Sequence, residues 1–167
     1  MEWYDKLAPS YDELYGEEQV KKYGMALSLE EVLRKDLVLD VGCGTGLFLE
    51  FLGNRSPPAF YVGVDFSSGM LSFRKRSKEV AHDYVLADAE FLPFKDSCFD
   101  KVFSITVLQD SLSAERMEGE MMRVSRGAIV ISVLKKGRFE MKAEGKLREA
   151  PIQGTKDRFL VTRIEDK

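Results

Sequence analysis

The residues LVLDVGCGTGLFLEF (37–51) decide the fold of this chain. An apolar, β-rich run (37–41) leads directly into Gly42, Gly44 and Gly46, and a second apolar run follows. Because three closely spaced glycines lose much backbone entropy on folding, we interpret this loop as a ligand-binding turn. In α/β sheets, such a loop lies where ligands bind, at the carboxyl ends of the strands.

Further short apolar segments follow the glycine loop. Strands are predicted over 60–65, 84–88, 100–106 and 128–134, and helices over 17–34, 46–53, 68–80 and 114–124. Short buried strands that alternate with helices are typical of parallel sheets. We therefore predict an α/β fold with three layers, built on a doubly wound, Rossmann-like and mostly parallel sheet.

The C-terminal segment breaks this alternation. Residues 146–154 and 158–166 have the pattern of two strands joined by a turn, which predicts a C-terminal antiparallel hairpin. Pro151 makes the first of them an edge strand or an interrupted one. The expected organisation is a single domain (1–167) with an N-terminal helical lid (1–36), a cofactor-binding core (37–134) and the C-terminal hairpin (135–167).

Length and composition narrow the class of protein. A chain of 167 residues, 44% hydrophobic and 32% charged, suits one soluble globular domain. No apolar run approaches the roughly 20 residues that a membrane span needs, and the N-terminus does not resemble a signal peptide. Cys43 and Cys98 form neither a disulfide framework nor a metal-binding spacing. We expect a cytoplasmic protein without a metal and without a membrane partner.

We compare three candidate ligands for the glycine loop: a nucleoside triphosphate, a dinucleotide, and a ligand that carries an ammonium group. A nucleoside triphosphate needs G-x-x-x-x-G-K-[ST], and no lysine follows Gly42 at that spacing. A dinucleotide needs G-x-G-x-x-G, whereas this loop has the tighter G-x-G-x-G and follows an acid, Asp40. A carboxylate pointing toward the ligand is a poor neighbour for a pyrophosphate and a good one for an ammonium group.

Two more acids follow the next predicted strands. Asp65 is placed to accept hydrogen bonds from both ribose hydroxyls of a nucleoside, as acids do in dinucleotide sites. Asp88 is placed to accept from an adenine amino group, with the Ala89 N–H nearby. One such acid is often only a turn residue, but three at successive strand ends fit a ligand with an ammonium, a ribose and an adenine, and with no phosphate.

The stretches VLDVGCGTG, VGVDFSSGML and LADAEFLPFKDSCFDKVFSI resemble the class I S-adenosylmethionine-dependent methyltransferases. The similarity is strongest to small ubiquinone-biosynthesis-like enzymes of the methyltransferase-domain 11 type, which also include enzymes acting on RNA and protein. It runs over about residues 1–134 and includes an A-x-x-Y-D element at Ala8–Asp12. The resemblance implies a methyltransferase whose cofactor is S-adenosyl-L-methionine and whose product is S-adenosyl-L-homocysteine.

The resemblance also implies roles for individual residues. Asp40 and the backbone of the glycine loop would hold the methionine end, and Asp65 would bind the ribose. The full set that it implies for cofactor binding is Asp40, Gly42, Cys43, Gly44, Gly46, Asp65, Phe66, Met70, Asp88, Ala89, Thr106 and Val107. Within this set Phe66 flanks the adenine, Asp88 and Ala89 read its edge, and Thr106 and Val107 line the floor beside the sulfonium. Cys43 is equally suited to filling apolar space, and Met70 to helix packing.

The catalytic residues stay open, because the cofactor brings an already activated methyl group and the protein has only to place a nucleophile in line with it. Weak candidates are Gln109, Asp110 and Tyr11. Asp110 also suits a turn or cap before the next helix, and Tyr11 also suits a staple between N-terminal elements. Enzymes that methylate exocyclic or side-chain amide nitrogens typically carry Asn or Asp, two prolines and an aromatic after the fourth strand, and SITVLQDSL (104–112) lacks that pattern.

The methyl acceptor is predicted from length. Only residues 135–145 separate the last parallel strand from the hairpin, so a helical cap over a small substrate does not fit there. An open site suits a macromolecular acceptor, protein or RNA, with a small zinc-binding activator subunit along a sheet edge or a homodimer as expected assemblies. The alternatives are a quinone- or amine-type small-molecule methyltransferase, and a non-catalytic cofactor-binding subunit.

Overall fold

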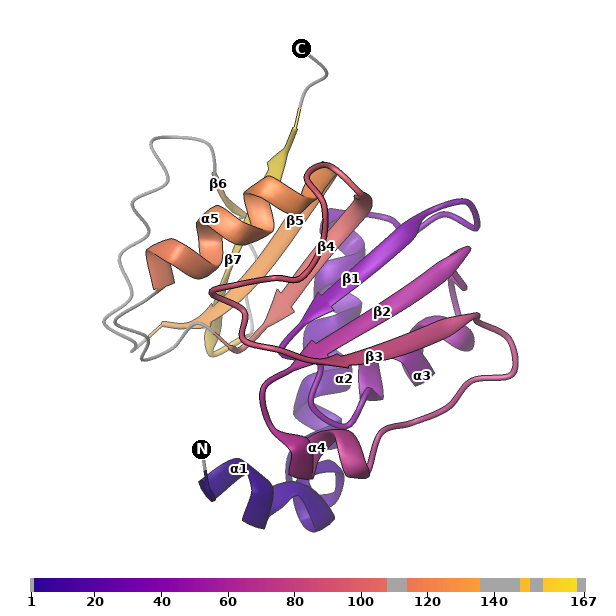
Figure 1. The fold of residues 1–167 in the computed structure, drawn as a ribbon, viewed down its shortest axis with the longest axis vertical. Helices are drawn as coiled ribbons and strands as arrows, with labels where there is room; N and C mark the ends of the chain where they lie inside the picture. Colours follow the sequence, from indigo (N-terminus) through magenta and orange to yellow (C-terminus); the bar gives the residue numbers. More distant parts are fainter. Residues whose placement is uncertain (1, 108–113, 136–147, 151–154, 165–167) are drawn as a thin grey trace.

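The computed structural model describes residues 2–107, 114–135, 148–150 and 155–164 (Figure 1). The helices are α1 (Glu2–Leu7), α2 (Tyr11–Leu29), α3 (Leu47–Gly53), α4 (Ser68–Ser72) and α5 (Ala114–Val124), with a 3-10 turn η1 (Ala8–Ser10) between α1 and α2. The strands are β1 (Leu37–Val41), β2 (Phe60–Asp65), β3 (His82–Leu86), β4 (Phe99–Ile105), β5 (Ser125–Leu134), β6 (Arg148–Ala150) and β7 (Asp157–Arg163).

The strands form one sheet in the order β3-β2-β1-β4-β5-β7-β6. The first five pair in parallel, and β7 pairs antiparallel with both β5 and β6. Strand order reverses between β1 and β4, because β2 and β3 extend the sheet on one side and β4 and β5 on the other. The glycine loop follows β1 and therefore lies at this switch point, where α/β sheets bind ligands.

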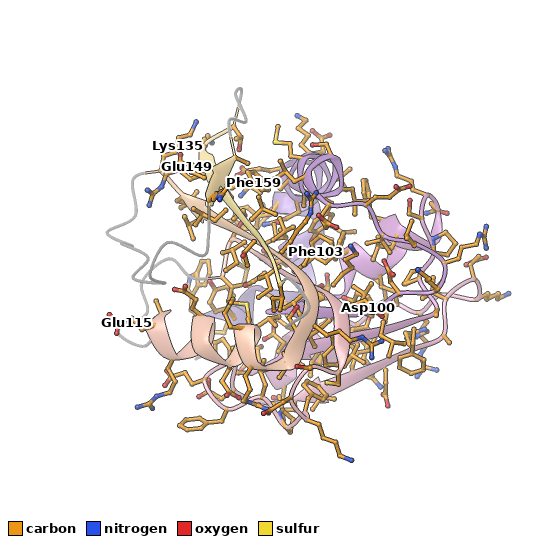
Figure 2. The ribbon with its side chains drawn as sticks, turned by 90° about the horizontal axis from the view of Figure 1, so that it is seen from above. Asp100, Phe103, Glu115, Lys135, Glu149 and Phe159 are labelled. Carbon is orange, nitrogen blue, oxygen red and sulfur yellow. The ribbon has the colours of Figure 1, made fainter. Side chains whose placement is uncertain are left out.

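Alternate residues of each strand supply two separate cores. Leu39, Val102 and Ile131 face α5, whereas Val38, Phe103 and Phe159 face α2 and α3. In Figure 1, α5 lies in front of the part of the sheet formed by β5 and β7 while α2 runs behind the sheet, and Figure 2 shows Phe103 and Phe159 on the α2 side. The predicted three-layer Rossmann-like fold is confirmed.

The predicted C-terminal hairpin is also confirmed, although β6 is only three residues long. Pro151 lies outside the described residues. Because β7 is inserted between β5 and β6, the hairpin extends the sheet and brings Asp157 next to β5. Within the described ranges, no helix combines the length and the apolar character that a membrane span requires.

The predicted helix over 68–80 is wrong, because α4 ends at Ser72. The Lys75 N–H donates to the carbonyl of Thr45 in the glycine loop (2.8 Å) instead of continuing the helix. The hydroxyl of Ser77 then accepts from the N–H groups of Glu79 and Val80 in a local turn, a known competitor of helix formation.

Other boundaries also differ from the predicted ones, and β5 begins at Ser125 rather than at residue 128. The strand β3 begins at His82 and ends at Leu86, so Asp88 lies two residues beyond the strand end. The helix α2 begins at Tyr11, six residues before the predicted start, and ends at Leu29.

Candidate functional site

The glycine loop bends because all three glycines adopt the left-handed conformation, with φ of 77° at Gly42, 55° at Gly44 and 74° at Gly46. The Gly42 N–H donates to the carbonyl of Val64 on β2 (2.8 Å), which fixes the start of the loop. A Cβ on Gly42 would lie 2.2 Å from a methyl group of Val107, whereas a Cβ on Gly44 would meet nothing within 4 Å. The loop is therefore packed at its first glycine and open at its second.

Asp65 ties this loop to the end of β2. Its Oδ2 accepts from the Gly44 N–H (2.8 Å) and its Oδ1 from the Ser67 N–H (2.9 Å). Burial raises the pKa of this carboxyl above its usual value, although both backbone hydrogen bonds act in the opposite direction. Each carboxylate oxygen has a second lone pair, so the side chain retains capacity for the predicted ribose contact.

Asp40 lies deeper than its predicted role suggests. It is buried, and its Oδ2 accepts from the hydroxyl of Tyr61 at 2.6 Å. Burial raises the pKa of the Asp40 carboxyl to about 7, against the lowering effect of the Tyr61 hydrogen bond. A cation brought close to Asp40 would favour its charged form. Its contact with the methionine end of the cofactor stays a prediction.

The residues predicted to surround the adenine lie after β2 and β3. Phe66 is 45% exposed and makes an edge-on contact with the ring of Tyr4 from α1 (6.2 Å between centroids). The Asp88 carboxylate accepts the N–H of Glu90 through its Oδ1 (2.9 Å). Ala89 packs at the edge of the core on the α5 side.

Other predicted cofactor residues have evident packing roles. Met70 is buried in α4, and its N–H donates to the hydroxyl of Ser67, which caps that helix. Cys43 is buried, and burial holds the pKa of its thiol well above the usual value. A Cβ on Gly46 would lie 2.0 Å from the hydroxyl oxygen of Tyr84. Their direct contact with a ligand stays a prediction.

The N-terminal segment reaches the loops after β1 and β2 through two aspartates. Asp12 accepts the hydroxyl of Thr45 (2.6 Å) and forms an ion pair with Lys75 (2.8 Å). Asp5 accepts the hydroxyl of Ser67 and the N–H of Gly69 (2.9 Å). In Figure 1, α1 and α4 lie together beyond the carboxyl ends of β1 and β2. The A-x-x-Y-D element contains Asp12, but nothing in the sequence indicated its partners.

The catalytic candidates divide into two groups. Tyr11 is described, and burial raises the pKa of its phenol to about 12, so the hydroxyl keeps its proton at neutral pH and is not a general base there. Gln109 and Asp110 lie outside the described residues.

His82 begins β3, and Cys98 precedes β4 at the amino end of the sheet, away from the glycine loop. Thr106 and Val107 follow the end of β4, as predicted.

The residues present fit S-adenosylmethionine. Open space lies in front of Gly44, and within the described ranges no Lys or Arg forms an ion pair with Asp40, Asp65 or Asp88. Carboxylates that have no cationic partner favour an ammonium group and sugar hydroxyls, and they repel a diphosphate. The fold and this edge together define a Rossmann-like α/β protein that binds a nucleoside without phosphates.

Comparisons with known proteins agree with this class. The methyltransferase domain family matches residues 39–131. The chain belongs to this family and is a class I S-adenosylmethionine-dependent methyltransferase domain, as the sequence resemblance implied.

The relatives include proteins with and without a stated activity. The chain is 38% identical over 123 residues to the uncharacterized protein MJ1252 of Methanocaldococcus jannaschii, covering 74% of this chain and 46% of that one. It is 35% identical over 138 residues to a malonyl-[acyl-carrier protein] O-methyltransferase of a Marinomonas species, covering 80% and 51%. The chain thus spans about half the length of these curated relatives.

Solved structures share the fold. A complex of the Haloferax volcanii Trm112 methyltransferase activator with a methyltransferase gives a TM-score of 0.69 at 22% identity, covering 78% of this chain and 59% of that one. Magnesium protoporphyrin IX methyltransferase of Synechocystis with bound S-adenosylhomocysteine also gives 0.69, at 17% identity, covering 91% and 84%.

Proposed function

We propose that this protein transfers the methyl group of S-adenosylmethionine to an acceptor carried by a macromolecule, a protein or an RNA. The observation that carries the proposal is the shortness of the connections at the carboxyl edge. Residues 106–113 join β4 to α5, and residues 135–147 join β5 to β6. An average helix takes roughly 10–14 residues, so connections of this length are too short for a pair of helices that would enclose a small substrate.

The protein's tasks in this reaction are binding and orientation. S-adenosylmethionine supplies a methyl group that the positive charge on its sulfur has already activated. Asp65 would bind the ribose while it holds the Gly44 backbone in place, and Asp40 would favour the ammonium of the methionine end. Thr106 and Val107 would shape the wall along which the acceptor approaches. Tyr11, which is neutral at physiological pH, would donate a hydrogen bond to the acceptor or to the cofactor.

The relatives support an acceptor on a macromolecule in one respect. Several curated relatives are named for malonyl-[acyl-carrier protein], a small acyl group attached to a protein. An open edge would admit such a group while its carrier stays outside.

The test is transfer of a tritiated methyl group into an extract of the source cells, separated into protein, RNA and small-molecule fractions. Label in the protein or RNA fraction is expected, with little label when the Asp65→Ala variant replaces the wild type. The Glu31→Ala variant is the control, because Glu31 is an exposed acid before β1 and lies on neither the proposed cofactor site nor β3. Label only in small molecules would favour the quinone- or amine-type alternative, and no label despite cofactor binding would favour a non-catalytic subunit.

We also propose that a small activator protein docks along β3. This strand is an edge of the sheet, and edge strands present unpaired backbone groups that another chain can pair with. Leu86 at its end and Phe91 beyond it are 59% and 65% exposed. Co-expression with the Trm112 activator of the same organism should give a stable heterodimer that Leu86→Glu weakens. A homodimer unaffected by that change would contradict this partner.

A further inference from the structure

A cluster of buried polar side chains lies beside the end of β4, and the cofactor assignment does not explain it. Lys22 from the middle of α2 is 4% exposed, and Ser132 on β5 and Asp157 at the start of β7 are fully buried. All three side chains contact Thr106, the first residue after β4. Elements from the two ends of the chain therefore meet at one residue of the cofactor edge.

The hydrogen bonds in this cluster run in one consistent direction. The Lys22 ammonium donates to the Thr106 hydroxyl (2.9 Å), which donates to Asp157 Oδ2 (3.1 Å). The Ser132 hydroxyl donates to the same Oδ2 (2.9 Å) and accepts the Thr106 N–H (3.0 Å). Lys22 also forms an ion pair with Oδ2 directly (3.2 Å). Both the backbone and the side chain of Thr106 are thus held.

Only one of the two carboxylate oxygens of Asp157 has hydrogen-bond partners among the described residues. Three donors converge on Oδ2, whereas the buried Oδ1 has no hydrogen-bond partner among the described residues. A buried ion pair is weak evidence of stabilisation, because desolvation of two charges offsets their attraction. The ion pair between Lys22 and Asp157 instead orients one carboxylate oxygen of Asp157 toward the Thr106 hydroxyl.

Thr106 requires support from its neighbours because its backbone is in the left-handed conformation, with a φ of 64°. A β-branched residue rarely adopts the left-handed conformation, and it does so only where its surroundings impose it. The turn at Thr106 brings the next residue, Val107, against the first glycine of the loop, where a Cβ on Gly42 would lie 2.2 Å from a Val107 methyl group. The conformation of Thr106 thus sets one wall of the cofactor edge.

We infer that Lys22 and Asp157 are positioning residues that hold Thr106 in its left-handed conformation and thereby fix Val107 against Gly42, in the geometry that binds the cofactor. Neither residue needs to touch the ligand. The inference rests on the proposed role of this edge in binding S-adenosylmethionine and S-adenosylhomocysteine. The wild-type affinity for S-adenosylhomocysteine is therefore measured first, by titration calorimetry, and absence of wild-type binding would overturn the site assignment and this inference with it.

The decisive variant replaces the pair by apolar side chains, Lys22→Met with Asp157→Leu, because such replacements often preserve folding. We expect a melting temperature close to that of the wild type and an affinity for S-adenosylhomocysteine that is about tenfold weaker, the effect of releasing one strained residue. The matched control removes the ion pair between Lys101 and Glu30, away from the glycine loop. Lys101→Met with Glu30→Gln should leave the affinity unchanged.

A second comparison decides the matter if the double variant fails to fold. Thr106→Val keeps the shape of the side chain but loses the hydroxyl contacts with Lys22, Ser132 and Asp157. Thr106→Asn introduces a residue that enters the left-handed region readily. The inference predicts weaker binding by the Val variant than by the Asn variant. Wild-type affinity in the folded double variant, or in Thr106→Val, would show that the cluster has only a structural role.

Discussion

The carboxylate of Asp12 on α2 accepts a hydrogen bond from the hydroxyl of Thr45, between the second and third glycines of the loop, at 2.6 Å. The other oxygen of Asp12 pairs with Lys75, whose N–H donates to the Thr45 carbonyl. One residue of the N-terminal segment thereby holds the glycine loop and the chain after α4 together. The N-terminal segment therefore supports the glycine loop of the cofactor site.

Asp12→Ala should therefore loosen the loop. The loss of one charged hydrogen bond at a partly exposed position is expected to lower the free energy of unfolding by about 1 kcal/mol. Amide hydrogen exchange over residues 42–46 should become faster, and affinity for S-adenosylhomocysteine should fall. Glu13→Ala, an exposed neighbour on α2, is the control. Equal exchange in both variants would mean that the contact is incidental.

Asp65→Ala should weaken cofactor binding more than any other single carboxylate change. The predicted ribose hydrogen bonds to a charged acceptor and the support of the Gly44 N–H are lost together. We expect a decrease in binding free energy of about 1.5–3 kcal/mol by titration calorimetry. Glu31→Ala, at an exposed position before β1, should bind as the wild type does. An unchanged affinity of Asp65→Ala would refute the ribose assignment.

Asp40 should give the stability of the fold a defined pH dependence. The pKa of its carboxyl is about 7 in the folded state and about 3.9 in an unfolded chain, so the folded state holds an extra proton between these values. The stabilising contribution is complete below about pH 4 and is lost as the pH rises to about 7.

The measurement compares urea unfolding of the wild type and of Asp40→Asn at pH 5, 6, 7 and 8. The wild type should lose stability relative to the variant by at most about 1.4 kcal/mol per pH unit up to pH 7, and then level off. The Asn side chain can still accept from Tyr61, so packing is preserved. Two parallel stability curves would show that Asp40 does not titrate in this range.

Gly42→Ala should destabilise the fold. A left-handed conformation costs a non-glycine residue roughly 1–2 kcal/mol, and the added methyl group would overlap Val107. A second change, Val107→Ala, should recover part of the loss in thermal unfolding, because it removes the overlap but not the backbone strain.

Gly119→Ala in α5 is the matched control for Gly42→Ala. This helical glycine has no atom within 4 Å of an added Cβ, so the change should stabilise the protein by about 0.5–1 kcal/mol. If Gly42→Ala melted like the wild type, the described close approach of Val107 would be wrong.

The local pattern of residues was enough to predict the sheet. Apolar β-rich segments of five to seven residues, each followed by a turn or a helix, predict parallel strands, because the strands of a parallel sheet are buried on both faces. The same logic placed Asp40, Asp65 and the three glycines at one edge, since the carboxyl ends of parallel strands meet there. The exact strand ends and the short α4 were not predicted. The end of α4 depends on a distant group, because the Lys75 N–H donates to the Thr45 carbonyl.

By itself, the sequence determined the Rossmann-like fold, the glycine loop and the family, because these follow from patterns of neighbouring residues. Only the tertiary structure decided that Asp40 is buried against Tyr61, that Asp12 binds Thr45, and that Lys22 and Asp157 meet at Thr106. Lys22 and Asp157 are 135 residues apart in the sequence. From the sequence alone, each would be predicted to be an ordinary charged residue on the surface. Their pairing depends on α2 packing over β4 and β5 and on β7 pairing with β5, which no local pattern encodes.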